Sequence, residues 1–157
     1  MQLVLWRHAE AEDHASTDLG RNLTARGRQQ ARKMAQWFDG QIAHKWSDWA
    51  VLVSPANRAQ QTAAALAQPF HTIDLIAPDA AAEAVIAATA WPRGIAGRAN
   101  VLVVGHQPTL GMVAARLIGG TAGNISVKKG AMWWFETRER DGRYQTVLKT
   151  MVTPDTA

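Results

Sequence analysis

The chain has 157 residues, with 47% hydrophobic and 19% charged residues, a balance that excludes intrinsic disorder and predicts a single domain over residues 1–157. The formal net charge is +4, but no Lys- or Arg-rich run indicates nucleic-acid binding, and the absence of cysteine excludes disulfides and thiolate sites. The chain shows neither a signal-peptide pattern nor an apolar stretch of the ~20 residues that span a bilayer, so we expect a cytoplasmic protein without membrane contact.

The first quarter of the chain predicts a strand, a loop and a helix in that order. The continuous apolar run at residues 3–6 is typical of a strand that is buried on both faces. Residues 9–23 are polar and predict a loop. Thr24 is suited to cap a helix that runs to about Asp39, and Gly40 is suited to end it.

The middle of the chain continues this alternation. A second strand is predicted at residues 50–53. A helix over residues 54–67 follows, with Ser54 as its cap and a proline in its first turn, where the missing N–H costs nothing. A third strand at 70–76 and an Ala-rich helix at 79–91 complete this part.

The last third of the chain changes its pattern. A loop, a fourth strand and a further helix come first, and they are expected at residues 91–98, 101–104 and 108–118. Residues 131–137 and 144–152 then flank Asp141-Gly142, a pair typical of a β-hairpin turn. Repeated strand–helix units predict an α/β fold, a three-layer α-β-α sandwich with a mostly parallel sheet and a C-terminal antiparallel hairpin.

Basic side chains follow three of the predicted strands. Arg7 and His8 come at the end of the first, Arg58 lies in the first turn of the helix after the second, and His106 follows the fourth. Ligands of parallel sheets bind at the carboxyl ends of the strands, so we expect these four side chains to share one cationic pocket. Arginine forks match phosphate oxygens, and a neutral imidazole is a nucleophile at phosphorus. We expect His106 to donate to the phosphoryl oxygens in its protonated form.

Each residue taken alone also has an ordinary structural interpretation. A single histidine after a strand is more often a packed residue, and a single arginine on a helix is more often surface charge. Metal ligation by His8 and His106 lacks a third ligand at a recognisable spacing, so we expect no metal and no other cofactor. The remaining histidines, His14, His44 and His71, are expected to be structural or solvated.

Taken together, these segments resemble the histidine phosphatase (phosphoglycerate-mutase-like) superfamily. Four motifs match in order and spacing: Arg7-His8-Ala9, Leu23-Thr24-x-x-Gly27, Ser54-Pro55-x-x-Arg58-x-x-Gln61-Thr62 and Gly105-His106-x-Pro108. The short chain and the Gly-His-Gln-Pro segment are most similar to the small phosphohistidine phosphatases of the SixA type. The resemblance implies the phosphoglycerate-mutase-like fold.

The resemblance also implies roles for the residues of the pocket. It implies that His8 forms a phosphohistidine intermediate that water later hydrolyses. It implies that Arg7, Arg58 and His106 bind the phosphoryl oxygens. Arg21 occupies a place where the small SixA-type enzymes often carry an arginine near the pocket, which makes it a further candidate for substrate binding.

This chain departs from the pattern of the family in two places. Ala9 stands where many members have glycine, which is harmless unless the backbone there has a positive φ. No convincing general acid follows the third strand, since the candidates Asp79 and Glu83 are also ordinary charges for the start of a helix. An imidazole leaves more easily than an alkoxide, so the missing acid favours phosphohistidine over phosphate monoesters as the substrate.

Three functions remain open from the sequence. The first is a metal-independent phosphohistidine phosphatase acting on a phosphorylated protein. The second is a phosphomonoesterase for a small phosphorylated metabolite, with specificity contacts from Arg21, residues 13–17 or residues 89–98. The third is a non-catalytic phosphate-binding module, which the intact His8 disfavours, because any cation would serve for binding alone. The sequence does not indicate the oligomeric state.

Overall fold

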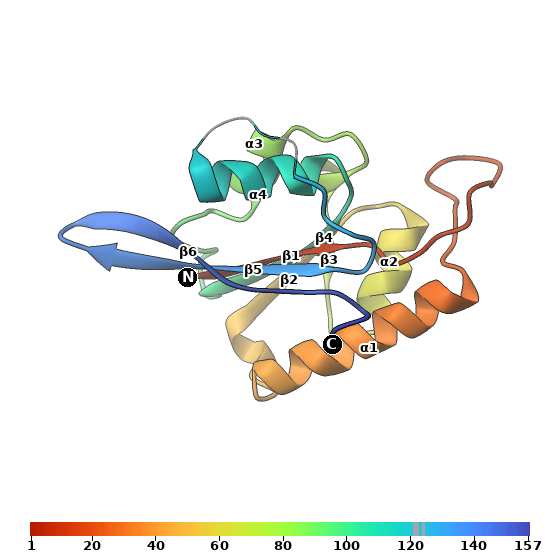
Figure 1. Cartoon of the computed structure of the whole chain (residues 1–157), viewed down its shortest axis with the longest axis horizontal. Helices are drawn as coiled ribbons and strands as arrows, with labels where there is room; N and C mark the ends of the chain where they lie inside the picture. Colours follow the sequence, from red (N-terminus) through yellow and green to blue (C-terminus); the bar gives the residue numbers. More distant parts are fainter. Residues whose placement is uncertain (121–122, 124) are drawn as a thin grey trace.

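A computed structural model describes residues 1–120, 123 and 125–157, and its centre is one mixed six-stranded sheet (Figure 1). The strand order is β3-β2-β4-β1-β5-β6. The strands are β1 (Gln2–Arg7), β2 (Trp49–Val53), β3 (His71–Thr72), β4 (Asn100–Gly105), β5 (Met132–Arg140) and β6 (Arg143–Val152). The helices are α1 (Ala25–Gln41), α2 (Asn57–Ala64), α3 (Ala82–Ala88) and α4 (Thr109–Gly119), with 3-10 turns at Trp46–Asp48 and Asp74–Ile76.

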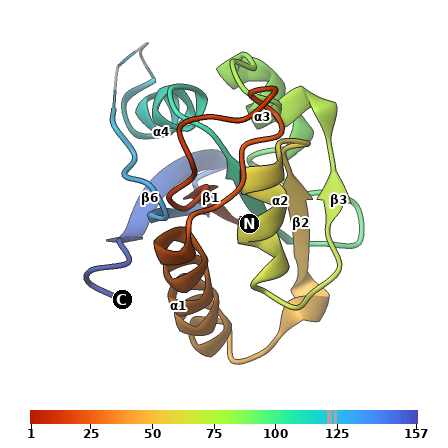
Figure 2. The ribbon, with the colours of Figure 1, turned by 90° about the vertical axis from the view of Figure 1, so that its right-hand side faces the viewer.

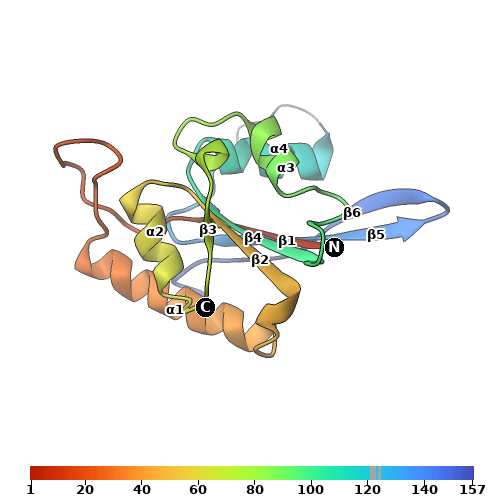
Figure 3. The same ribbon diagram turned by 180° about the vertical axis from the view of Figure 1, so that it is seen from behind.

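The pairing of the strands confirms the predicted class of fold. β1, β2, β3 and β4 are parallel to one another, while β5 is antiparallel to β1 and β6 is antiparallel to β5. Asp141 and Gly142 form the β5–β6 turn with φ of 52° and 72°, the left-handed geometry that an Asp-Gly hairpin turn requires. The far end of this hairpin extends beyond the rest of the sheet (Figures 1 and 3).

Helices cover both faces of the sheet and make the three layers. α1 and α2 lie on one face and α3 and α4 on the other (Figures 1 and 3). Alternate residues of β1 enter the two cores: Trp6 packs in the core that contains Phe38 of α1, and Leu5 packs in the core that contains Leu110 of α4. The central strands are therefore apolar on both faces, as their continuous apolar runs predicted.

Two predicted helix ends are wrong. Gly40 lies inside α1, which continues to Gln41, and no atom would stand within 4 Å of a Cβ added at Gly40, so nothing there forces the helix to stop. The helix after β2 begins at Asn57, and its cap residue is Ala56, which caps with no side-chain hydrogen bond. Ser54 lies outside that helix, and its backbone N–H donates to the carbonyl oxygen of Val104 at 3.1 Å, which continues the pairing of β2 with β4.

The segment between α2 and β4 also differs from the prediction. The expected strand at 70–76 is reduced to the two residues of β3, after which the chain turns into the 3-10 turn Asp74–Ile76. The expected helix at 79–91 is shorter at both ends, because Asp79 and Ala90 have φ of 64° and 52°. A left-handed conformation at both positions limits the helix to α3.

The register of the sheet places the ends of three strands side by side. Arg7 of β1 pairs with Gly105 of β4, and Val53 of β2 pairs with Val104. The chain between β1 and α1 then runs out past this edge of the sheet (Figures 1 and 2). In the described part of the chain, no helix has the length and apolarity needed to cross a membrane.

Candidate active site

A pocket of about 260 Å³ opens where β1, β2 and β4 end. Every side chain predicted for the site lines it: Arg7, His8, Arg21, Arg58 and His106. Among its other lining residues are Asp18, Asp79, Gln107 and Lys129. The structure thus brings together residues that lie up to about a hundred positions apart, because parallel strands end at one edge of the sheet.

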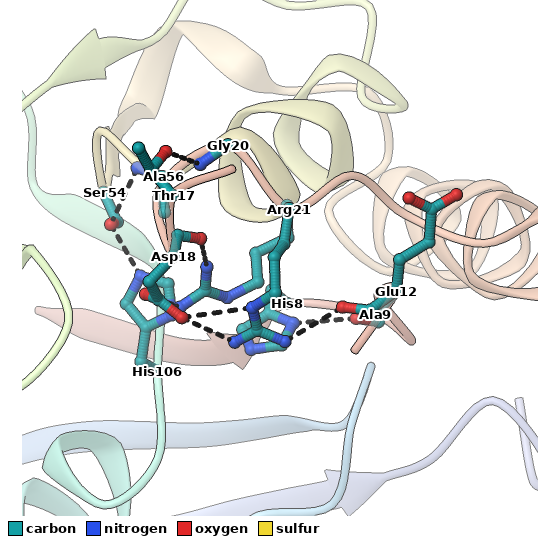
Figure 4. Close-up of polar contacts among 11 residues, drawn as sticks. His8, Ala9, Glu12, Thr17, Asp18, Gly20, Arg21, Ser54, Ala56 and His106 are labelled. Atoms are coloured by element: carbon teal, nitrogen blue, oxygen red, sulfur yellow. Dashed lines mark hydrogen bonds and ion pairs between the residues drawn. The ribbon is translucent and has the colours of Figure 1, made fainter. Parts of the chain in front are cut away.

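His8 is held in one orientation by the backbone next to it. Its Nδ1 lies 2.7 Å from the carbonyl oxygen of Ala9, an atom that can only accept, so Nδ1 carries the hydrogen (Figure 4). In the neutral ring this leaves a lone pair on Nε2. Burial, opposed by the hydrogen bond to Ala9 and aided by the charges of Arg58, Arg7 and Arg21, lowers the pKa of His8 to about 4. The ring is a neutral base at pH 7.

His106 lies across the pocket from His8, with 5.2 Å between the ring centroids. It is 4% exposed, and its Nε2 lies 2.6 Å from the hydroxyl oxygen of Ser54 (Figure 4). Burial, together with the charges of His8 and Arg58, lowers the pKa of His106 to about 3. In the protein without a ligand, this ring is therefore neutral as well.

Arg7 and Arg58 are anchored by contacts that use only part of each guanidinium group. Nη1 of Arg7 donates to the carbonyl oxygen of Val127 at 2.8 Å. Arg58 is 3% exposed and donates two hydrogen bonds to Asp18. Its Nη1 donates to the backbone carbonyl oxygen at 2.8 Å, and its Nη2 donates to a carboxylate oxygen at 3.1 Å. The Nε atoms of both arginines remain free.

Buried donors without a partner gather in this pocket. Among the described residues, four buried side-chain nitrogen or oxygen atoms have no hydrogen-bond partner, and three of them are Arg7 Nε, Arg58 Nε and His106 Nδ1. Buried polar atoms in native proteins almost always have partners, so an exception requires an explanation. These three nitrogen atoms belong to residues that line one cationic pocket, a lining that is suited to a tetrahedral oxyanion.

Arg21 lies in the pocket, but its donors are already engaged. Its Nε and Nη2 both donate to one carboxylate oxygen of Asp18, at 3.1 and 2.9 Å, and its Nη1 donates to the carbonyl oxygen of Glu12 (Figure 4). The carboxylate of Asp18 therefore bridges Arg21 and Arg58. Slight burial acts to raise the pKa of Asp18, but the hydrogen bonds from these two arginines hold it below its ordinary value.

The two candidate acids lie in different surroundings. Asp79 lines the pocket, in the loop before α3 rather than on the predicted helix. Glu83 does lie on α3, where its exposed carboxylate pairs with Arg116. Of the two, only Asp79 lines the pocket.

The structure gives outcomes for Ala9 and for the three histidines outside the pocket. Ala9 is not among the residues with a positive φ, so alanine replaces glycine there without strain. His14, His44 and His71 are exposed, and in the part of the chain that the structure describes no group of three or more His, Cys, Asp or Glu side chains is placed to hold a metal ion.

Three parts of the site are not apparent from the sequence. Asp18 belongs to a polar loop, and only the tertiary structure shows that it reaches two arginines. The sequence predicts Ser54 as a helix cap, and its contact with His106 depends on the pairing of β2 with β4. The carbonyl oxygen of Val127 is a backbone atom, which carries no signal in the side chains. The i, i+3 spacing of Asp18 and Arg21 is the one signal that the sequence contains.

Known proteins resemble this chain in sequence and in structure. A model of the histidine phosphatase superfamily (branch 1) matches residues 3–85. Phosphohistidine phosphatase SixA of Escherichia coli (strain K12) is 32% identical over 125 residues, which is 76% of each chain. A phosphohistidine phosphatase SixA homolog of Haemophilus influenzae is 32% identical over 130 residues, which covers 76% of this chain and 78% of the relative.

The comparison of structures extends over almost the whole chain. The structure of the protein histidine phosphatase SixA complexed with tungstate has a TM-score of 0.80 and 28% sequence identity. The match covers 99% of this chain and 98% of that one.

Proposed function

The chain belongs to the histidine phosphatase superfamily and is a phosphatase, and from this premise we propose that it removes phosphate from phosphohistidine in a protein through a covalent phospho-His8 intermediate, without a metal ion. The observation that carries the proposal is the arrangement of donors in the pocket. One neutral imidazole nitrogen, His8 Nε2, shares the pocket with three buried nitrogen atoms that lack partners. That arrangement suits a phosphoryl group under attack by His8.

The first step transfers the phosphoryl group to His8. The Nε2 lone pair forms a bond to phosphorus while the P–N bond of the substrate breaks, and the bonding electrons leave with the substrate nitrogen. When the other nitrogen of the substrate ring is already protonated, the product is neutral imidazole, and no acid from the enzyme is needed. Arg7 and Arg58 stabilise the charge on the equatorial oxygens during this transfer.

The second step restores the enzyme. The oxygen of a water molecule bonds to phosphorus, the bond from phosphorus to Nε2 breaks, and its electron pair returns to His8. The water proton passes to phosphate or solvent. The hydrogen on Nδ1 stays on the ring throughout, held by the Ala9 carbonyl oxygen, so His8 leaves phosphorus as neutral imidazole.

Support for a protein substrate comes from the relatives and from the leaving group. Both curated relatives are phosphohistidine phosphatases by name, and a related structure holds tungstate, an oxyanion. A phosphohistidine side chain needs no dedicated acid, and cations outnumber carboxylates in the pocket, where Arg7, Arg21, Arg58 and Lys129 stand against Asp18 and Asp79.

The position of Asp79 supports a second candidate function. An ester substrate leaves as an alkoxide and needs a proton in the transition state. Asp79 lines the pocket and is the candidate acid for that role. The alternative is a phosphomonoesterase for a small phosphorylated metabolite.

One experiment separates these functions. Phosphate release is measured from matched phosphohistidine and phosphoserine peptides, with EDTA present, for wild type, His8→Ala and Asp79→Asn. We expect release from phosphohistidine that is lost in His8→Ala and unchanged in Asp79→Asn. His44→Asn, which removes an exposed histidine beyond the C-terminal end of α1, serves as the control and should keep full activity.

Two results would change the assignment. Comparable release from the phosphoserine peptide, lost on Asp79→Asn, would establish the phosphomonoesterase instead. Release that EDTA abolishes, or that survives in His8→Ala, would contradict the metal-independent mechanism through His8.

A further inference from the structure

Ser54 and His106 form a buried pair at the ends of two neighbouring strands. Ser54 follows β2 and His106 follows β4, and the backbone N–H of Ser54 donates to the carbonyl oxygen of Val104 at 3.1 Å. The hydroxyl oxygen of Ser54 lies 2.6 Å from His106 Nε2. Ser54 is fully buried and His106 is 4% exposed, so water does not compete for this hydrogen bond.

The direction of this hydrogen bond follows from the partners of the hydroxyl group. The oxygen of Ser54 already accepts a hydrogen bond from the backbone N–H of Ala56 at 3.3 Å. The hydroxyl group has one hydrogen to donate, and His106 Nε2 is the acceptor that stands within reach. The reverse direction would leave a buried hydroxyl hydrogen without an acceptor, which is unfavourable. The hydroxyl of Ser54 therefore donates to Nε2.

The hydrogen on the other nitrogen of the ring then has a defined place. When Nε2 accepts, the neutral imidazole carries its hydrogen on Nδ1. His106 Nδ1 is buried, has no partner among the described residues, and belongs to a ring that lines the pocket. An N–H there would donate to an oxyanion, whereas a bare lone pair would repel it.

We infer that Ser54 is a positioning residue that fixes His106 as the neutral tautomer protonated on Nδ1, so that His106 donates one hydrogen bond to the phosphoryl group without being charged. The inference rests on the proposed function for the identity of the ligand, and it differs from the expectation, drawn from the sequence, of a ring that is protonated in the complex. The lowered pKa of about 3 for His106 agrees with a neutral ring at pH 7. Ser54 thereby has a role in the site that helix capping does not explain.

The tautomer can be observed directly in the resting protein. Long-range ¹H–¹⁵N spectra of histidine-labelled protein at pH 7.5 show which ring nitrogen carries hydrogen, and a His106→Gln variant identifies the signals. We expect a neutral ring with Nδ1 protonated, and we expect inorganic phosphate to perturb that N–H signal. A ring protonated on Nε2, or on both nitrogens, would overturn the inference.

Two variants connect the tautomer with activity. Ser54→Ala removes the donor to Nε2, and we expect loss of the single Nδ1–H tautomer and phosphate release slower by about 10- to 100-fold, the range found when the partner that orients a metal-ligating histidine is removed. Thr137→Val is the control, because it removes a hydroxyl that donates to the carbonyl oxygen of Met1, beside the end of β1 that lies opposite to Arg7 and His8. It should leave the tautomer and the rate unchanged. An unchanged tautomer in Ser54→Ala would overturn the role of Ser54.

Failure of this inference is distinguishable from failure of the proposed function. The tautomer is read without a phosphorylated substrate, while the function is read from phosphate release by wild type. Release by a wild-type protein whose His106 is protonated on Nε2 would remove the inference and keep the function.

Discussion

A buried imidazole beside several guanidinium groups has a low affinity for protons, and both histidines of the pocket illustrate this. His8 and His106 are nearly inaccessible to solvent, and burial is the largest cause of their lowered pKa values. The nearby arginines cannot lose their charge to relieve the repulsion. His8 therefore remains a neutral imidazole at pH values where an exposed histidine would be protonated.

The lowered pKa values predict how the stability of the protein depends on pH. The folded-state pKa values are about 4 for His8 and about 3 for His106, against an ordinary value of 6.5 for histidine. Between pH 6.5 and 4, the unfolded chain binds protons that the folded chain does not, so acid favours unfolding. Each histidine contributes a slope of up to about 1.4 kcal/mol per pH unit to the free energy of unfolding.

Urea unfolding between about pH 5 and 6.5, in buffers without phosphate or sulfate, measures this slope. We expect the free energy of unfolding of wild type to fall as the pH is lowered, and the slope to be smaller in His8→Gln. The exposed His14 offers a control, because His14→Gln should retain the wild-type slope. Equal slopes in wild type and His8→Gln would contradict a neutral, buried His8.

At the residue scale, the sequence predicted which residues form the site better than it predicted which of their side chains contact one another. Motif spacing brought His8, His106, Arg7 and Arg58 into one site, because each ends a strand, directly follows one or lies in the first turn of a helix. It did not reveal that Arg21 is occupied by Asp18, since that ion pair depends on the path of an irregular loop.

Among the elements, the start of α1 has a direct effect on the site. Thr24 caps α1, because its side chain accepts from the N–H of Gly27 at 2.9 Å. A Cβ at Gly27 would stand 1.9 Å from the carbonyl oxygen of Glu10, so only glycine allows the helix to pack this closely. Glu10 follows Ala9, whose carbonyl oxygen orients His8. The Leu-Thr-x-x-Gly motif therefore supports the nucleophile from outside the pocket.

Two glycine substitutions in α1 are predicted to have opposite effects. Gly27→Ala should destabilise the protein by about 2–3 kcal/mol, because the methyl group overlaps the Glu10 backbone. Gly40→Ala should stabilise it by about 0.5–1 kcal/mol, because that site is helical and open. Thermal unfolding measures the stability of both variants, and phosphate release measures their activity. Gly27→Ala should also lose activity. Equal melting temperatures for the two variants would contradict the packing of Gly27.

Boundaries of the elements were predictable only where local sequence decides them. The cap at Thr24 and the turn at Asp141-Gly142 are local and were predicted correctly. The short β3 was not predicted correctly, since an apolar run can form a strand only where a neighbouring strand is available to pair. The left-handed conformation of Asp79 was not predicted either. Ser54 is a favourable cap residue by type, but Ala56 occupies the cap position and the hydroxyl group of Ser54 contacts His106 instead.

At the scale of the whole molecule, the alternation of strands and helices places the residues of one site together at one edge of the sheet. The order β3-β2-β4-β1 places β4 between β1 and β2, so the ends of these three strands are neighbours. Alternation along the chain was enough to predict the class of fold and the edge where the site lies. The order of the strands was not predicted, because pairings such as β1 with β4 join segments distant in the sequence.

The most direct test of the account is to capture the phosphoryl group on the enzyme. Wild-type protein is mixed with a phosphohistidine peptide, quenched in alkali within the first turnover and digested, and mass spectrometry locates the phosphate. We predict phosphate on His8 that disappears as turnover proceeds and that is absent in His8→Gln. Phosphate release without any phosphorylated His8, or phosphate found on another residue, would contradict the covalent mechanism.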